Sequence, residues 1–583
     1  MISSFFDFDF TKCPNDKKCI FDFKLPISYL DKDKLFKLPD TVTQDLDINN
    51  DSSGNLYSFL FNPDNEFSRE NMKLWNEYYT NDITFLNDTQ NIISNMDSLN
   101  ISYTKFDSIN SIWNETKNNS NFYGKYNYFE WNILKSFNLS SLVMLILCIL
   151  QLSTPFFFFI APIIVLIIPF FILKFQGLPI SISIYYNVVC SLIKDKLFGK
   201  ILDKFESLNF YAFAYMFACI VFYIIQLYQN VNTCYVFYNN IKNVNNYIDD
   251  LSEYISSSIK NINQFYSISK NCITYSHFNQ ILLEKQNHLS NLLKELSHVS
   301  SFSNSLSKIH EFGKLLRCFY IIHSDNNYES ALQFSTGFNG YLYNIHNVHL
   351  LIKQNHLNLA DFSPSFNCNI KDQYYPNLIN NDSLVKNNID LSNNVIITGP
   401  NASGKTTLIK TTTLNVIFSQ QLGCGFYKSC QINPYTHIHS YINIPDTSNR
   451  DSLFQAESRR CKDIIDIILK YPSQNYRHFC IFDELYSGTN PVEASQAGYA
   501  FLKYLSKFKH VDFILTTHYV YICKKFKKST RIKNFKMKVE FDNFQNYLFK
   551  YKMIPGISEI KGAIKVLKDL EYPSEIINTI EKI

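Results

Sequence analysis

The chain has little charge, glycine or proline. Only 18% of its 583 residues are Asp, Glu, Lys or Arg, against about a quarter in typical soluble domains. The formal net charge of +4 is too small to indicate a nucleic-acid partner by itself. Asn, Ile, Lys, Phe and Tyr are used heavily instead, which we interpret as the coding bias of an A+T-rich genome. Hydrophobic residues make up 46% of the sequence, enough for a large core, and the length allows several domains.

The sequence also lacks a zinc-ligand set and a secretory signal. Its 14 cysteines are scattered, and neither close pair, Cys13 with Cys19 or Cys424 with Cys430, belongs to a four-ligand set with zinc spacing. Free thiols in a reducing compartment are therefore expected. The opening MISSFFDFDF has no basic segment followed by an apolar run, so we expect no signal peptide.

Residues 1–140 show no recognisable chemistry. Strand-like and helical patches alternate there with polar loops, and residues 49–54 (NNDSSG) indicate a turn or linker. We interpret this segment as an N-terminal mixed region with a structural role.

Two uncharged stretches dominate residues 141–230. The first, 142–173, has 32 positions without a charge, and as one helix it would span roughly 48 Å, against about 30 Å for the apolar core of a bilayer. It shows no polar stripe, which a soluble helix normally has, so we predict that it inserts into a membrane. Its three prolines are expected to kink it. The second stretch, 208–228, fits a membrane helix and a buried core helix equally well.

The membrane topology stays open. The loop between the two stretches carries Lys174, Lys194, Lys196, Lys200 and Lys204, which the positive-inside rule places in the cytoplasm. A cytoplasmic C-terminal part is compatible with that placement in a re-entrant or hairpin arrangement, whereas two full passes would put the loop outside.

Residues 231–345 have a helical pattern. Apolar residues from Ile241 to Tyr266 recur at spacings of three and four, and a second such run extends from 281 to 299. The pattern fits an antiparallel helical arm and an ordinary helical bundle equally well. The polar faces are rich in Asn and Ser rather than Lys, which gives weak support for a DNA grip.

The segment NNVIITGPNASGKTTLIK fits the phosphate-loop pattern G-x-x-x-x-G-K-[ST], with an apolar strand before it and a helical pattern after it. Glycines let backbone N–H groups turn toward phosphate oxygens, and the helix N-terminus adds the positive end of its dipole. We predict that Lys405 neutralises charge on the β- and γ-phosphates and that the Thr406 hydroxyl binds Mg²⁺. The predicted nucleotide contacts are Gly399, Pro400, Asn401, Ala402, Ser403, Gly404, Lys405, Thr406 and Thr407.

Two further strands carry candidate catalytic groups. In HFCIFDELYSGTN an apolar strand ends at Asp483 and Glu484; Asp483 is predicted to hold Mg²⁺ through water and Glu484 to orient the attacking water. In VDFILTTHYV the next strand ends at His518, which can sense the γ-phosphate. Solvated acids and a lone histidine would be the ordinary interpretation of either segment alone. Their place after the phosphate loop favours Lys405, Glu484 and His518 as a catalytic set.

At this point the sequence resembles a known family. GPNASGKTT, DELYSGTN and TTHYV, in this order, resemble the ATPase domain of the MutS family, and the C-terminal YKMIPGISEIKGAIKVLKDLEYPSEIINTI is similar to its closing strand and helices. QYYP and LVKNNIDL resemble the lead-in to its nucleotide site. The resemblance implies a multidomain chain: an α/β phosphate-loop NTPase of the ABC/MutS type at 346–583, preceded by a helical lever or core region at 231–345 and by the hydrophobic, membrane-associated helices.

The resemblance also implies partners for the site. MutS-family ATPases bind ATP and Mg²⁺ and form dimers in which each site is completed by the other subunit. The trans-acting signature loop corresponds to SNRDSLFQAESRR, with Ser452, Phe454 and Glu457 at the matching positions and Asn449 in place of a glycine. The residues that stack on the adenine correspond to Leu384 and Tyr551, so one aromatic partner is replaced.

The family's mismatch-reading wedge has no counterpart here. The only Phe-x-Glu is 482–484, inside the ATPase motif, and 140 residues are too few for both a reader and a connector domain. We therefore expect no direct mismatch recognition. A basic run, 524–538, has eight Lys or Arg in fifteen positions; contact with phosphates and a solvated edge both fit it.

Two function classes remain. The first is a MutS-like ATPase of the mismatch-repair family that handles DNA without reading mismatches. The second is a membrane-anchored ATPase that acts on a membrane or protein partner. The ATPase motifs do not distinguish them, because they predict ATP hydrolysis but not the molecule on which the protein acts. Under both we expect a homodimer, located at a membrane with the ATPase domain facing the cytoplasm. The composition fits a genome such as that of a large DNA virus.

Overall fold

The computed structural model describes residues 20–48, 56–98, 106–175, 181, 185, 210–365, 367–379, 384–442, 444, 452–472, 475–541, 547–560, 567 and 570–582. Its contacts divide the chain into two compact units. The first comprises Met1–Ile20, Tyr103–Ile259 and Asn287–Leu332, and the second comprises Phe21–Ser102, Lys260–Gln286 and Gln333–Ile583. Each unit is assembled from three separate stretches, whereas the four segments suggested by the sequence are continuous.

The first unit is built from helices. Helix α7 (Ser141–Phe175) packs closely on α12 (Phe312–Ser324). The two helices approach so closely at Gly313 that a Cβ there would lie 2.1 Å from the backbone oxygen of Ser141. The other helical elements that fall wholly or partly in this unit are α5 (Phe106–Trp113), η3 (Asn114–Asn118), α6 (Phe122–Tyr126), η4 (Lys135–Leu139), α10 (Phe210–Ser269), α11 (Ser276–Leu296), η6 (Leu306–Glu311) and α13 (Asn326–Lys353).

Helix α10 changes character along its length. From Phe237 onward it buries one apolar side chain every three or four residues, including Ile241, Val244, Ile248 and Leu251. The amphipathic seam expected from the sequence is therefore confirmed. Before Phe237 the same helix exposes large apolar side chains on several sides, among them Phe222, which is 61% exposed.

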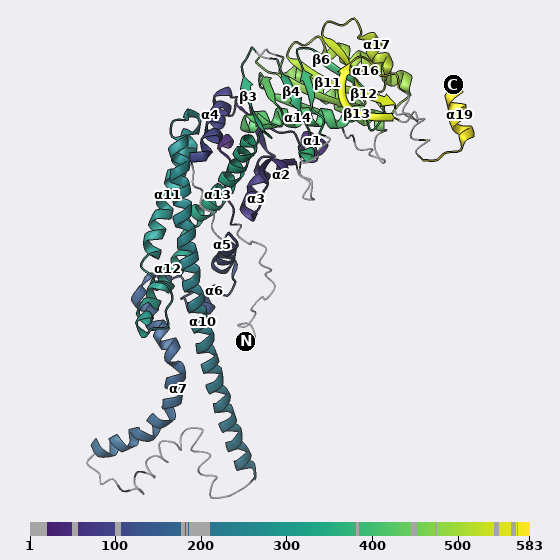
Figure 1. Ribbon diagram of the computed structural model, residues 1–583. Coiled ribbons are helices and arrows are strands. Elements are labelled where there is room, and N and C mark those ends of the chain that lie inside the picture. Colours follow the sequence, from purple (N-terminus) through teal and green to yellow (C-terminus); the bar gives the residue numbers. More distant parts are fainter. Residues whose placement is uncertain are drawn as a thin grey trace, which may run out of the picture. The chain divides into compact units, whose positions relative to one another are not determined.

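Helix α7 is also apolar and exposed. It is continuous over the predicted stretch and bends along its length (Figure 1), as its prolines predict. The Tyr223 hydroxyl of α10 donates a hydrogen bond to the Phe158 carbonyl of α7 at 3.0 Å, yet Phe156 remains 63% exposed. Within the described residues, one helix window, Ser141–Ile164, is long and apolar enough to cross a membrane, and 11% of it is buried. Of the loop lysines, only Lys174 lies in the described part.

In the second unit, N-terminal elements pack on helix α14 (Lys405–Leu422). The Tyr57 hydroxyl donates to Gln421 Oε1 at 2.7 Å, and the amides of Gln420 and Gln421 donate to the carbonyls of Thr80 and Trp75. Residues between Phe21 and Ser102 thus pack against α14, while a structural role for the whole of 1–140 stays a prediction. The elements between Phe21 and Ser102 are η1 (Pro26–Tyr29), β1 (Leu35–Lys37), α1 (Asp40–Asp45), α2 (Leu56–Phe61), α3 (Glu66–Leu74), β2 (Tyr78–Thr80), α4 (Ile83–Ser94) and η2 (Asn95–Ser98), with η5 (Ile273–Tyr275) beside α4.

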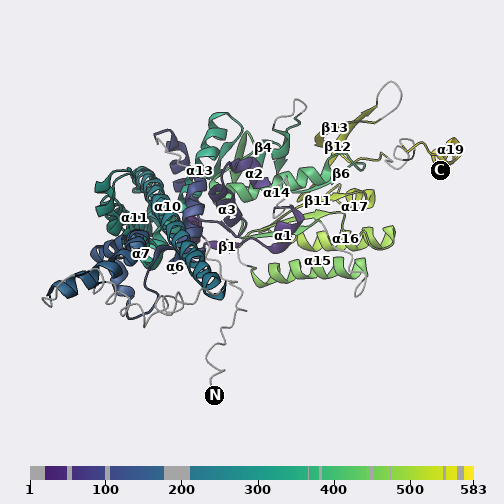
Figure 2. The same cartoon turned by 90° about the horizontal axis from the view of Figure 1, so that it is seen from below.

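A six-stranded sheet forms the centre of this unit, in the order β13-β12-β6-β11-β10-β9. Five strands are parallel and β13 is antiparallel to β12. The strands are β6 (Asn394–Thr398), β9 (His437–Tyr441), β10 (His478–Asp483), β11 (Val511–Thr517), β12 (Ile532–Phe541) and β13 (Tyr547–Pro555). One face packs on α15 (Leu453–Lys470), α16 (Pro491–Leu505) and α17 (Val520–Lys525), while α14 lies on the other (Figure 2). Helix α19 (Ser574–Lys582) follows near the C-terminus.

A second sheet in this unit has five strands in the order β5-β4-β8-β3-β7. It consists of β3 (Asn358–Phe362), β4 (Asn369–Gln373), β5 (Asn387–Asp390), β7 (Cys424–Gly425) and β8 (Ser429–Ile432), with η7 (Pro376–Leu378) after β4. Strand β5 contacts β13, so the two sheets meet beside the phosphate loop. This arrangement confirms a mixed α/β fold for the C-terminal part.

Within the described residues, ten cysteines are free thiols, as expected. Burial raises the pKa of Cys424 and of Cys430 to about 12, so both remain protonated thiols at neutral pH. In the same residues, no group of three or more His, Cys, Asp or Glu side chains could hold a metal ion.

Candidate functional site

The phosphate-loop segment joins β6 to α14 through an unusual backbone. Ala402 and Gly404 have φ angles of 60° and 90°, and such left-handed positions next to helical ones turn successive N–H groups toward one concave side. Glycine suits position 404 because of this positive φ, and a Cβ there would also make a tight contact of 3.1 Å with the Tyr551 ring. The Ser403 hydroxyl closes the loop by donating to the Pro400 carbonyl at 2.7 Å.

Lys405 begins α14 and lies against this loop. Its ammonium donates to the carbonyl oxygens of Gly399 and Pro400 at 3.0 and 3.2 Å. The residue is 5% exposed, and burial lowers the pKa of the Lys405 ammonium, although Glu484 and Asp483 oppose the shift. A partly desolvated cation held at the mouth of a backbone loop attracts an anion strongly, because the local dielectric screens it weakly.

Thr406 and Asp483 meet as predicted, although they come from different elements. Strands β6, β11 and β10 are in register so that Ile397, Thr516 and Asp483 are aligned at the carboxyl edge of the sheet. The Thr406 hydroxyl donates to Asp483 Oδ2 at 2.7 Å, and the Thr516 hydroxyl donates to the other carboxylate oxygen. This pair of oxygen ligands fits Mg²⁺, which keeps several waters and needs only one or two carboxylates.

Glu484 and His518, each predicted as a catalytic residue, lie in contact with one another. Glu484 has a φ of 50°, and its backbone N–H donates to the Thr516 carbonyl at 3.0 Å. Its Oε1 lies 2.8 Å from His518 Nε2, and this hydrogen bond keeps the pKa of Glu484 below its ordinary value. Lys405 Nζ is 3.2 Å from the same ring nitrogen. One nitrogen cannot both donate to a carboxylate and accept from an ammonium, so we assign the shorter contact, in which Nε2 carries the proton.

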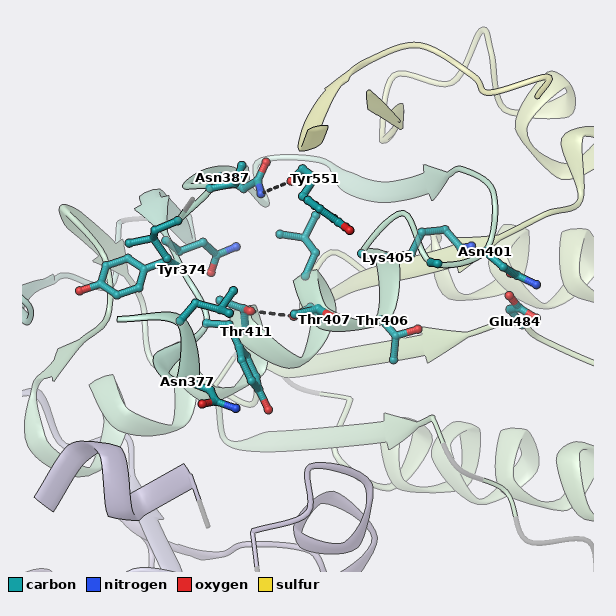
Figure 3. A pocket seen from close by; sticks show the side chains of 18 residues that line it. Tyr374, Asn377, Asn387, Asn401, Lys405, Thr406, Thr407, Thr411, Glu484 and Tyr551 are labelled. Atoms are coloured by element: carbon teal, nitrogen blue, oxygen red, sulfur yellow. Dashed lines mark hydrogen bonds between the residues drawn. The ribbon is translucent and has the colours of Figure 1, made fainter. Parts of the chain in front are cut away.

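A cavity of about 750 Å³ opens beside the loop (Figure 3). The predicted base-contacting residues Leu384 and Tyr551 both line it, as do Lys405, Thr406 and Glu484. The other lining residues are Gln373, Tyr374, Tyr375, Asn377, Leu378, Val385, Asn387, Asn401, Ala402, Gly404, Thr407, Leu408 and Thr411.

Several of these residues were missed by sequence reasoning. QYYP signalled only a lead-in, whereas Tyr374 and Tyr375 line the cavity. Asn387 is also missed: its amide donates to the Tyr551 carbonyl at 2.9 Å, and its oxygen accepts from the Met553 N–H at 2.8 Å. Asn387 therefore fixes β13 where Tyr551 takes a φ of 51°. Asparagine is a common turn residue, so the sequence carries no signal for this role.

The three residues of the signature-like loop lie at the start of α15. The Ser452 hydroxyl accepts from the Gln455 N–H, and the Gln455 side-chain oxygen accepts from the Ser452 N–H. These two bonds form a capping box. Phe454 contacts the Tyr486 ring at 5.7 Å. None of the three lines the cavity of its own chain, and residues 445–451 lie outside the described part.

Glu457 departs from the expectation of contact with a partner subunit. It is 2% exposed, and its carboxylate accepts from the N–H and hydroxyl of Ser487 and from the N–H of Gly488, at 2.8 to 3.2 Å. Burying a carboxylate requires such partners. Glu457 therefore holds the loop after Glu484 within its own chain, while a trans-acting role stays a prediction for Ser452 and Phe454.

The comparisons with known proteins concern the C-terminal third of the chain. Residues 395–583 match the family model described as MutS domain V. The DNA mismatch repair protein MutS of Parabacteroides distasonis is 28% identical over 193 residues, which is 32% of this chain and 21% of that protein. These matches support MutS-family membership.

Other relatives agree. The endonuclease MutS2 of Staphylococcus epidermidis is 30% identical over 213 residues, covering 35% of this chain and 26% of the relative. The DNA mismatch repair protein MSH3 of Candida albicans is 34% identical over 155 residues, covering 25% and 14%. The chain thus spans about a quarter or less of the length of these relatives. Residues 395–583, which match the family model, contain the phosphate loop, the β10 acids and His518 described above.

Proposed function

We propose that this chain is a Mg²⁺-dependent ATPase of the MutS type. The observation that carries the proposal is the convergence of Lys405, the Thr406–Asp483 pair and the Glu484–His518 pair at adjacent strand ends beside one cavity. These groups match the requirements of phosphoryl transfer, which is mostly positioning and charge stabilisation.

Each residue has a distinct role in the proposed hydrolysis. The loop N–H groups and Lys405 bind the β- and γ-phosphates, and Tyr551 with Leu384 covers the base. Glu484, ionised at neutral pH, orients a water for attack on the γ-phosphorus; the bond to the β-phosphate oxygen breaks and gives ADP and phosphate. His518 positions Glu484. Mg²⁺, held by Thr406 and Asp483, would neutralise charge on the phosphates.

The direct test is ATP turnover by the full-length protein with Mg²⁺ and with EDTA. Turnover should need Mg²⁺ and fall below detection in Lys405→Ala, together with loss of binding of a fluorescent ATP analogue. Lys410→Ala is the matched control, since Lys410 lies on the same helix and pairs with Asp47 at 3.0 Å. Equal turnover in the Lys405 and Lys410 variants would reject the site.

We further propose a homodimer in which ATP binding and hydrolysis drive a conformational change, with Ser452 acting in the partner's site. Ser452→Asp keeps an N-cap acceptor but places a negative charge toward phosphate. Mixing Lys405→Ala with Ser452→Asp subunits should restore one working site per heterodimer. Mixtures no more active than either variant alone would contradict the shared site.

We propose that this ATPase acts on DNA and binds it without recognising mismatches. Support comes from the relatives, two of which are named DNA mismatch repair proteins, and from the lack of a second Phe-x-Glu. Equal affinity for paired and mismatched duplexes is expected, and a clear preference for the mismatch would contradict this part.

A second candidate function is a membrane-anchored ATPase that acts on a membrane or protein partner, with the ATPase domain on the cytoplasmic side. It is favoured by the exposed apolar side chains of α7 and of the first part of α10. Water does not stabilise such surfaces, whereas lipid does. Carbonate-resistant pelleting of the full chain with membranes would support it, and recovery in the soluble fraction would contradict it.

A further inference from the structure

Positive charge is concentrated in one part of the second unit. Residues 503–538 contain 11 of the chain's 55 Lys and Arg but one of its 51 Asp and Glu. That acid, Asp512, is held by Arg477, whose Nη2 lies 2.5 Å from Asp512 Oδ2. It therefore does not offset the surface charge. Because the whole chain carries +4, the rest of it is net negative.

Nine of these lysines are exposed. Lys538 pairs with Glu540 at 2.7 Å, and we call the other eight the basic surface. They are Lys503, Lys507, Lys509, Lys524, Lys525, Lys527, Lys528 and Lys533.

The elements that carry the basic surface are packed together. Helices α16 and α17 lie beside one another (Figures 1 and 2), where the rings of Tyr499 and Phe526 are 5.0 Å apart. The Arg531 guanidinium donates to the Ser506 and Phe508 carbonyls, and this ties the start of β12 to the end of α16. The elements that carry the lysines are therefore held together by direct contacts.

The basic surface keeps most of its charge available. Of its eight lysines, all of which lie in the described part of the chain, only Lys524 forms an ion pair, with its Nζ 3.5 Å from exposed Glu559. Three others lie over tyrosine rings, at 5.7 Å for Lys503, 5.4 Å for Lys507 and 5.3 Å for Lys525. Such contacts orient an ammonium without neutralising it.

We propose that the basic surface binds the phosphate backbone of duplex nucleic acid. Lysines are point charges that contact phosphates without reading bases, so the binding is sequence-independent and driven by counterion release. Nucleic acid is favoured over insertion into a membrane interface, because helices that lie in the interface bury an apolar face there. Here only Tyr521, 43% exposed, is an exposed large hydrophobic residue between 499 and 538.

The proposal rests on the DNA-handling function proposed above, but it is independent of ATP hydrolysis. Lys509 and Lys533 lie at the amino ends of β11 and β12, whereas the phosphate loop follows the carboxyl end of β6. Variants of the basic surface should therefore keep the basal ATP turnover of the wild-type protein, and a loss of DNA binding with turnover intact separates the two proposals.

The test uses the full-length protein in a neutral detergent and a fluorescent duplex of random sequence. Changing Lys524, Lys525, Lys527 and Lys528 to Gln should lower affinity at least tenfold at low salt. The slope of log affinity against log salt should fall by about 2–4, since each lost phosphate contact contributes about 0.9. The matched control changes four exposed lysines elsewhere, Lys32, Lys270, Lys428 and Lys470, and should stay within twofold of the wild type.

A second variant, with Lys503, Lys507 and Lys509 changed to Gln, guards against local unfolding of α17 and should show the same direction of change. Unchanged affinity and slope in both variants would overturn the proposal. So would a selective loss of binding to phosphatidylserine-containing vesicles, relative to phosphatidylcholine vesicles, with DNA binding intact, because the partner would then be lipid.

Discussion

The phosphate-loop region and the α7–α10 region depart from an ordinary soluble domain in opposite ways. The first buries polar groups: Lys405 and Glu457 are almost fully covered, and each has several hydrogen-bond partners. The second exposes apolar groups such as Phe156 and Phe222. Buried polar groups are costly unless they are paired, and exposed apolar area is costly in water. The buried polar groups of the first region find their partners within the chain, whereas the exposed apolar groups of the second indicate an apolar phase as their partner.

The largest expected effect concerns the α7–α10 region and the insertion of α7 into a membrane. Ile164→Arg places a charge in the uncharged part of α7. On translocon-insertion scales, this charge raises the free energy of membrane insertion by about 2.5–3.5 kcal/mol. Much of the protein should move from the membrane to the soluble fraction, measured by carbonate extraction.

Ile273→Arg is the control for this change, since Ile273 is exposed in the second unit and its substitution should leave the distribution unchanged. A wild-type protein that purifies as a monodisperse species without detergent would contradict the anchor and return both helices to an unusually apolar core.

A smaller effect concerns buried polar groups behind the phosphate-loop region. Burial lowers the pKa of His437 to about 4 and of His478 to about 3, and that of His439 well below its ordinary value. The unfolded chain binds these protons near pH 6.5, so the histidines destabilise the fold only below that pH. Stability should be constant above about pH 6.5 and fall as the pH decreases toward 4.

Urea denaturation across this pH range measures the effect. His478→Phe should remove up to about 1.4 kcal/mol per pH unit of the decline. The exposed His298 provides the control, and His298→Phe should leave the pH profile unchanged. A profile equally steep in His478→Phe would show that this histidine is not the source.

The smallest effect concerns the base-binding side of the cavity. Asn387→Ala removes both bonds to β13, so Tyr551 should lose its position and the KM for ATP should rise several-fold, with kcat within twofold. Asn388→Ala is the neighbouring control. Tyr551→Ala should match the Asn387 variant, and the double variant should add little. A change in kcat alone would instead place Asn387 in the chemical step.

The sequence was most informative where chemistry is local. Gly404, Lys405, Asp483 and Glu484 follow apolar strands directly, so residue order was enough to place them at one sheet edge. Tyr374 and Asn387 were missed because their roles arise from a strand of the second sheet meeting β13. The support of α14 by Tyr57 was equally invisible, since its partner Gln421 is 364 residues away.

The helical segments were predicted in part for a related reason. Periodicity fixed the seam of α10 from Ile241 to Leu251, and the lack of charge identified α7. Neither pattern could show that the second uncharged stretch and the amphipathic run form one helix, because no local signal marks continuity. Glu457 was expected to contact a partner subunit. It is instead buried in its own chain, where its carboxylate accepts hydrogen bonds from Ser487 and Gly488.

The central claim is that Glu484 acts on a nucleotide held by the phosphate loop. The most direct measurement is single-turnover ATP hydrolysis by the full chain and by Glu484→Gln, with ATP binding measured on the same samples and Glu493→Gln as control. The account predicts unchanged binding and a rate lowered about 100-fold or more in Glu484→Gln. Equal rates in the wild type and Glu484→Gln would contradict it.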